Sequence, residues 1–315
     1  MKIIKRFLIN KIVVYSLSLF LLYLFYLVPT NKDFKYETII NNNMDESVVY
    51  LIDNDNYLSR VVLYFDNKTI EEEIKNKIDI LINGSKDYLF FHPLIPKNTK
   101  LNSFKIDKNN VYLDFNESLL DVNKYYEEEM IEALIYSLTE INGIDNIYIS
   151  INGKELTLLP NSKKELHYPL NREYGINKEY DLNSLFNISK TTVYFVKSID
   201  DYNYYVPVTK VNNDQSEKIE IIISELKSSV NSVNNLNSYI SDNVKLVDYK
   251  KEDNKIELVF NEYLFNDTKV LESVEYMISS SVFDNYDVDK VIIKNENNSL
   301  NIEINNTWFL NIFLI

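Results

Sequence analysis

Two stretches near residue 50 are rich in β-branched and aromatic residues, and this pattern predicts a β-hairpin. Residues 47–52 and 58–64 have the composition that is typical of strands. The Asp and Asn residues that separate them favour a turn. A second pair of such stretches follows at 192–196 and 204–209. Pro207 in the last of these cannot donate a ladder hydrogen bond, so we expect an edge position or a bulge there.

A helical period follows each predicted hairpin. Isoleucine and leucine recur at helical spacing over residues 70–82, so one face of this helix is apolar. Thr69 and Glu72 form a capping box at its start, and the Asn-Gly pair after it is a stop signal. Asp214 and Glu217 precede the corresponding apolar series and are expected to cap the second copy of the helix.

The same order of elements continues in both halves of the chain. Residues 110–115 alternate between apolar and polar, which predicts a strand with one buried face. A second helix is expected over 130–138, where apolar residues recur at helical spacing, and a strand over 146–151. The apolar residues of 130–138 have counterparts in 274–282.

These halves are a duplication at a spacing of 145 residues. Residues 95–101 align with 240–246, and residues 113–119 align with 258–264. Nine of these fourteen positions are identical, where about one is expected by chance. The register then shifts by one, so that Ile144 aligns with Val288.

We therefore expect an α+β fold made of two tandem β-β-α-β-α-β domains. Each would form a small, mostly antiparallel sheet with two helices on one face. The domains span residues 46–160 and 190–315, and residues 161–189 form a linker whose aromatic and aliphatic side chains lie against a domain. Residues 308–315 are apolar but too few for a membrane helix, so a final strand is expected there.

The N-terminal region has the pattern of a transmembrane signal-anchor. Residues 12–28 contain no charge, and four cations lie within residues 1–11. The positive-inside rule places residues 1–11 in the cytoplasm, and residues 29–45 then form a juxtamembrane linker outside it. A cleaved signal peptide is the alternative, but it requires small residues after the apolar run, and none is present. Both interpretations export the body of the protein.

Charge and composition exclude several functions. The net charge is −14, and because residues 1–11 carry +4, the remaining residues carry −18. A body with this much negative charge repels phosphate backbones, which argues against a nucleic-acid partner. The chain has no cysteine and two histidines, so thiolate sites, lipidated cysteines and histidine clusters are excluded or nearly so. No cofactor, metal or catalytic residue is predicted.

Three catalytic or metal-binding alternatives are weaker than their structural interpretations. His92 has no neighbouring nucleophile and no G-x-S-x-G motif, so we expect a packed or capping residue. Asp114 or Glu117, at a strand end, is a candidate acid of a glycosidase-like carboxylate pair, but a solvated turn after the strand is favoured. Asp53 and Asp55 lie close together with Asp66 further on, yet no calcium loop motif is present, and a turn is favoured.

The chain resembles the GerM family, whose repeating unit is the GerMN domain of sporulation and spore-germination proteins. Residues 206–210, Val-Pro-Val-Thr-Lys, resemble a strand signature of that family. Residues 95–101 resemble its Ile-Pro-x-x-Thr-x-Leu segment, and residues 113–115 resemble its strand ending in Asp-Phe. The resemblance covers about residues 46–155 and 191–304, and the tandem arrangement is itself family-like.

Three features depart from the family pattern. Gly84-Ser85 replaces a Gly-Pro pair, and Ser241 replaces the proline in the second copy. The sporulation member of the family is a lipoprotein, whereas this chain has no cysteine to lipidate and has residues 12–28 in that place. The domain would still be held at a membrane surface, but by a different anchor.

We interpret the chain as a membrane-anchored, extracytoplasmic, non-enzymatic scaffold of the bacterial cell envelope. The resemblance implies a role in sporulation or spore germination. Its partners would be other envelope or transenvelope-complex proteins, peptidoglycan, and the cytoplasmic membrane through residues 12–28. The alternative is a peptidoglycan-binding or peptidoglycan-modifying protein that acts through carboxylates. The candidate interaction positions are those that recur in both copies or lie in family motifs: Pro96, Asn98, Thr99, Asn116, Glu117, Pro207, Asn243, Asn261 and Glu262.

Overall fold

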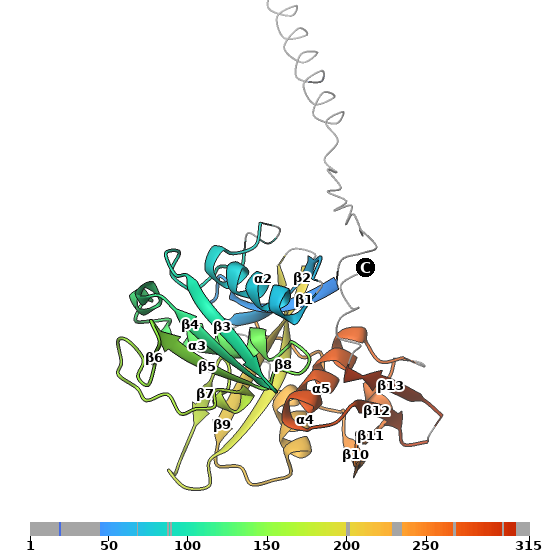
Figure 1. Ribbon diagram of the computed structural model, residues 1–315. Coiled ribbons are helices and arrows are strands. Elements are labelled where there is room, and N and C mark those ends of the chain that lie inside the picture. Colours follow the sequence, from blue (N-terminus) through green and yellow to red (C-terminus); the bar gives the residue numbers. More distant parts are fainter. Residues whose placement is uncertain are drawn as a thin grey trace, which may run out of the picture. The chain divides into compact units, whose positions relative to one another are not determined.

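The computed structural model describes residue 19 and residues 45–306, apart from 68, 87, 89, 200–201, 229–234, 267–268 and 298 (Figure 1). The chain divides into two compact units, residues 1–42 and 43–315. The predicted anchor at 12–28, except for residue 19, and the predicted final strand at 308–315 lie outside the described residues. Within the described part of the chain, no helix is both long and apolar enough to cross a membrane.

Each repeat contains the predicted order of elements, with further strands added. The first repeat consists of β1 (Asp45–Ile52), β2 (Leu58–Phe65), α2 (Ile70–Asn83), β3 (Leu101–Asp107), β4 (Asn110–Phe115), η1 (Glu117–Asp121), α3 (Glu127–Leu138), β5 (Asn146–Ile151) and β6 (Lys154–Glu155). The second consists of β8 (Ser189–Ile199), β9 (Tyr202–Asn212), α4 (Lys218–Ser228), β10 (Leu246–Glu252), β11 (Lys255–Phe260), η3 (Glu262–Leu264), α5 (Glu272–Asn285), β12 (Lys290–Asn295) and β13 (Asn301–Asn305). Between them lie η2 (Arg172–Tyr174) and β7 (Glu179–Asp181).

The expectation of a single sheet in each repeat is wrong. The hairpins of the two repeats, β1-β2 and β8-β9, belong to one shared five-stranded sheet. Its strand order is β1-β2-β9-β7, and β8 also pairs with β9. The remaining strands form one four-stranded sheet per repeat, β3-β4-β5-β6 and β10-β11-β12-β13. In both, the two middle strands are parallel and the outer pairings are antiparallel. Residues 47–52 of β1 and 191–197 of β8 are buried without interruption, as required where a strand is covered on both faces.

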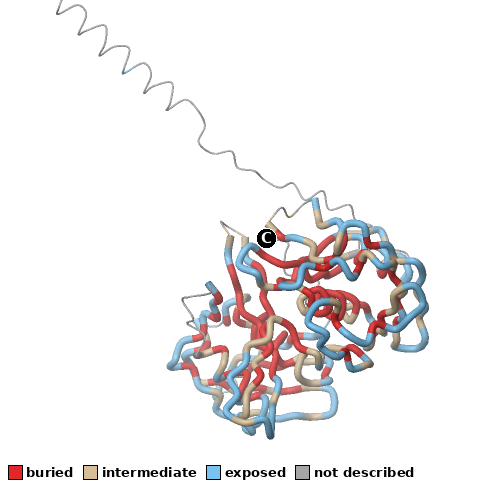
Figure 2. The backbone as a smooth tube through the Cα atoms, turned by 90° about the vertical axis from the view of Figure 1, so that its left-hand side faces the viewer, coloured by how far each residue is buried: buried red, intermediate tan, exposed pale blue. Residues whose placement is uncertain are grey.

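Helices α3 and α5 lie between sheets instead of covering one face. α3 contacts β1 of the shared sheet and β5 of its own repeat, and α5 contacts β8 and β12 in the same way. Consecutive residues 130–138 of α3 are all buried, which requires neighbours on every side. Figure 2 shows this buried material running through the body beneath an exposed outer layer.

The cap of α2 is confirmed and the cap predicted for α4 is wrong. Thr69 Oγ1 accepts a hydrogen bond from the backbone N–H of Glu72 at 3.2 Å, and Gly84 ends the helix with φ 77°. In the second repeat the helix begins only at Lys218. Asp214 instead accepts a hydrogen bond from the backbone N–H of Ser216 at 2.8 Å and closes a turn before the helix.

Pro207 lies in an internal strand, so neither an edge strand nor a bulge is found. β9 pairs with β8 along its whole length, and Tyr194 lies opposite Pro207. On the other side of β9, Asn177 fills a gap between two strands by donating to Pro207 O at 2.7 Å and Leu58 O at 2.8 Å. The N and O atoms of a strand residue point to the same side. The missing N–H of Pro207 therefore faces the gap and removes no bond to β8.

The linker lies against the first repeat, as expected. Leu170 exchanges backbone hydrogen bonds with Ile147 of β5 at 2.8 and 3.2 Å. Ile176 is fully buried, and β7 adds a parallel strand to β9. The linker is thus part of the packed body that joins the two repeats.

Candidate functional site

The structure contains two equivalent grooves, one in each repeat. The first lies between α2 and β3 and has a volume of about 1000 Å³. The second lies between α4 and β10 and has a volume of about 520 Å³. The residues that line them correspond at the 145-residue spacing. For example, Ile78 corresponds to Ile223, and Leu101 corresponds to Leu246. The duplication therefore retains a groove as well as a fold.

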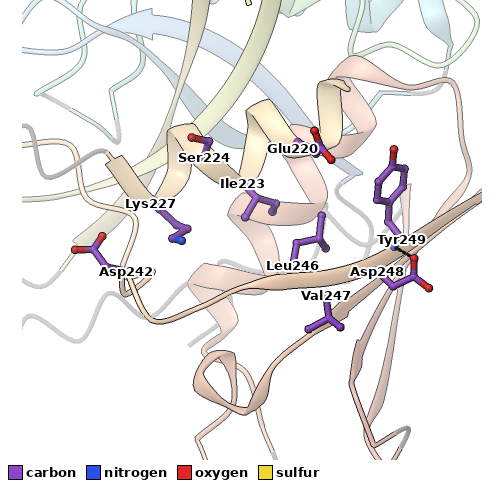
Figure 3. A pocket seen from close by; sticks show the side chains of 9 residues that line it. All are labelled: Glu220, Ile223, Ser224, Lys227, Asp242, Leu246, Val247, Asp248 and Tyr249. Carbon is purple, nitrogen blue, oxygen red and sulfur yellow. Dashed lines mark hydrogen bonds between the residues drawn. The ribbon is translucent and has the colours of Figure 1, made fainter. Parts of the chain in front are cut away.

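Each groove is made by a helix and an edge strand. β3 and β10 are each paired on one side only, with β4 and β11, in the sheets that the structure describes. Both strands carry a register shift at their start, between Leu101 and Ser103 and between Leu246 and Asp248. Figure 3 shows the second groove, where Ile223 of the helix and Leu246 of the strand face one another. A groove beside an unpaired edge strand is a known geometry for binding an extended peptide.

The two grooves have opposite charge. The ionisable lining of the first groove is Lys75, Asp79, Lys97 and Lys100. That of the second is Glu220, Lys227, Asp242 and Asp248. At the 145-residue spacing, Lys75 corresponds to Glu220 and Lys97 to Asp242. These sign reversals are present in the repeat alignment, but identity between the copies does not reveal them, so recurrence does not point to Lys75 and Lys97.

The recurring Asn residues are structural clamps at the groove rim. Asn116 Oδ1 accepts from the backbone N–H of Lys100 at 2.9 Å, and its Nδ2 donates to Asn98 O at 3.1 Å. Asn261 repeats both bonds with Lys245 at 3.0 Å and Asn243 at 2.9 Å. Each Asn thus fastens the segment before the edge strand to the end of the next strand. This explains why the motif recurs without requiring a ligand.

Three of the nine predicted positions line the first groove, and none of the nine lines the second. Those three are Asn98, Thr99 and Asn116. Thr99 is buried, its N–H bonds to Pro96 O at 2.9 Å, and its hydroxyl has no partner among the described residues.

The remaining acidic positions lie at the end of a strand or just after it. Glu117 and Glu262 begin the short helices η1 and η3, and Glu117 accepts from Asn152 Nδ2 at 3.3 Å. Asp114 accepts from the backbone N–H of Gly153 at 2.6 Å. The turn interpretation is confirmed for Glu117, whereas Asp114 lies within the strand β4. Pro207 is in the shared sheet, away from both grooves.

A buried polar cluster that the sequence did not predict joins the two repeats. Tyr50 OH and Tyr194 OH lie 3.4 Å apart, at equivalent positions 144 residues apart. Tyr50 OH donates to Glu140 Oε1 at 2.8 Å, and Tyr194 OH donates to Asp284 Oδ2 at 3.3 Å. Contacts that are repeated across a pair of equivalent residues indicate an approximate two-fold axis between the repeats.

Arg172 of the linker ties this cluster together. Its guanidinium donates to Glu140 Oε1 at 2.7 Å and to Asp284 Oδ1 at 2.5 Å, one carboxylate from each repeat. Burial opposes the charge of Glu140, but Arg172 and Arg60 outweigh it and lower the pKa of that carboxyl to about 2. Arg172 occurs once and lies in the linker, so a search for repeated residues could not find it.

The aspartates considered as calcium ligands instead hold a lysine. Lys197 Nζ donates to Asp53 Oδ2 at 2.7 Å and to Asp55 Oδ2 at 2.6 Å. Asp53 Oδ1 accepts from two backbone N–H groups of its own loop, so the predicted turn is confirmed. No group of three or more His, Asp or Glu residues in the described part of the chain could hold a metal ion. His92 is exposed and lies 3.1 Å from Asn54 Oδ1, with its backbone bonded to Ile52.

Comparisons with known proteins agree with the tandem architecture. A family model described as "Sporulation and spore germination" matches residues 48–157. The chain is 28% identical over 241 residues to the spore germination protein GerM of Bacillus subtilis, which covers 74% of this chain. The match spans 64% of the length of that curated relative. The solved tandem GerMN domains of the same Bacillus subtilis protein superpose with a TM-score of 0.74 at 29% identity, over 84% of this chain and 94% of that one.

Proposed function

Because the chain belongs to the GerM family of sporulation and spore germination proteins, we propose that it is a non-enzymatic scaffold of the cell envelope. In this proposal residues 12–28 anchor it in the cytoplasmic membrane, and both repeats lie outside and bind other envelope proteins. The observation that carries the proposal is that the repeats form one body with two grooves of opposite charge. Two grooves of different charge on one folded body are suited to binding two different partners at the same time.

Topology and partnership are tested in sporulating cells. Protease added to intact protoplasts is expected to digest the body while a tag placed at residue 1 survives. Crosslinking in the cell, followed by capture through that tag, is expected to recover the chain joined to other envelope proteins. Protection of the body, or recovery of the chain alone, would refute the proposal.

Peptidoglycan binding is a second candidate because of a tyrosine row on the first repeat. The rings of Tyr112 and Tyr148 stack at 4.5 Å, and those of Tyr148 and Tyr168 stack at 5.5 Å. Tyr112 is exposed, and flat aromatic faces bind the apolar faces of ligands. Co-sedimentation with purified cell-wall sacculi, lost in a Tyr112→Ala, Tyr148→Ala double variant, would favour this candidate. Equal sedimentation of both proteins would remove it.

A further inference from the structure

We infer that the groove of the first repeat binds an acidic, extended protein segment, which pairs as an additional strand with β3. This inference rests on the proposed scaffold function and names the class of partner for one of its two grooves. It follows from three properties of the groove: an unpaired strand edge, an apolar floor and unneutralised lysines.

The strand edge supplies the main-chain contacts. β3 pairs with β4 on one side, and no other described strand pairs with it. Alternate residues of an edge strand direct their N–H and C=O groups away from the sheet, where a ligand backbone can pair with them. The register shift beside Asn102 places a bulge at the groove, and bulges are frequent next to binding sites.

The floor supplies pockets for alternate side chains. The apolar lining consists of Ile78 and Ile82 of α2 and of Leu101 and Phe104 of β3. Leu101 and Phe104 are half-buried, so each has apolar surface that a ligand can cover. The volume of about 1000 Å³ is at the upper end of the range of about 300–1000 Å³ for ligand sites.

The charges select an acidic occupant. Lys75, Lys97 and Lys100 are exposed at the groove, and none forms an ion pair with a described residue. Lys75 Nζ lies 5.8 Å from the centre of the Phe104 ring, so it reaches across from the helix to the strand. Together with Asp79 these three cations give the groove a net positive lining within a chain of net charge −14. Their field attracts a negatively charged segment and orients its approach.

A second copy of the chain is a poorer occupant than a foreign segment. Two copies would approach with bodies of the same strongly negative charge. Lysines at an edge also discourage pairing between identical strands, because each strand carries the same positive charges. Both features remain compatible with a short acidic segment, whose charge the lysines complement.

The test is selection of random displayed peptides against the full chain in detergent. We expect the enriched peptides to be acidic and to alternate apolar residues. Replacing Lys75→Glu and Lys97→Asp, which installs the residues of the second repeat, should weaken their binding about ten-fold. Lys105→Glu is the matched control, because Lys105 lies on β3 but does not line the groove, and it should leave binding unchanged.

Backbone pairing is tested separately with synthetic forms of the selected peptides. Methylation of alternate peptide nitrogens should abolish binding in one register and spare it in the other, because only one set of N–H groups faces β3. Peptides without acidic bias, equal binding to the charge-reversed variant, insensitivity to methylation, or displacement by a second copy of the chain would each overturn the inference. Peptide binding is measured on purified protein, so its outcome is independent of the localisation and crosslinking results.

Discussion

Asn116 and Asn261 make the same two hydrogen bonds at equivalent positions of the two repeats. The same substitution at both positions should therefore have the same effect on stability. Replacing either by Ala removes a backbone–side-chain hydrogen bond in each direction and should lower the free energy of unfolding by about 1–2 kcal/mol. Asn109→Ala is the control, because its side chain makes a single exposed bond to Asp145. Urea titration of the three variants measures the difference. Equal stability of Asn116→Ala and Asn109→Ala would contradict the clamp.

Glu140 makes the free energy of unfolding depend on pH in the acidic range. Its pKa falls from an ordinary 4.5 to about 2 on folding, so the folded protein binds this proton less readily than the unfolded chain. The resulting stabilisation, about 3 kcal/mol, is complete above about pH 4.5 and is lost as the pH falls toward 2. Glu140→Gln should be less stable at neutral pH and show a flatter dependence over that window. Identical pH profiles for both proteins would exclude this role.

Helix α2 and helix α4 differ in how they begin, and the difference predicts unequal effects of matched substitutions. Thr69→Ala removes a side-chain cap and should cost about 1 kcal/mol. Asp214→Ala, at the equivalent sequence position, should change stability much less because Asp214 caps a turn outside the helix. Thermal unfolding followed by circular dichroism checks both. Equal losses would mean that Asp214 also holds the start of α4.

The elements themselves were predictable from the sequence because each depends on local patterns. The hairpins, the four helices and the β4 strand follow from side-chain period, turn residues and caps. Their assembly was not predictable, since pairing of β2 with β9 joins residues more than a hundred positions apart. The uninterrupted apolar run of residues 48–52 is a sequence signal for a strand that is covered on both faces. At the grooves, recurrence identified Asn98, Thr99 and Asn116 but not the charges that reverse between copies.

At the scale of the whole molecule, the shared sheet makes the two repeats one folding unit. Leu113 and Leu258 are fully buried at equivalent places in the separate sheets. Replacing either leucine by Ala should lower the free energy of unfolding by about 2–5 kcal/mol. In both variants calorimetry should show a single unfolding transition with a lower midpoint temperature. Two transitions, with each substitution lowering only one, would show that the repeats unfold independently.

Arg172 is the residue on which the union of the repeats depends most. Arg172→Met leaves Glu140 and Asp284 facing each other without the cation, and should cost about 3–5 kcal/mol. Lys163→Met, at an exposed linker position, controls for loss of a positive charge. Adding Glu140→Gln and Asp284→Asn to Arg172→Met removes both carboxylate charges and should restore much of the loss. If calorimetry finds no recovery in the triple variant, the cost of Arg172→Met comes from lost packing, and electrostatic joining of the repeats is refuted.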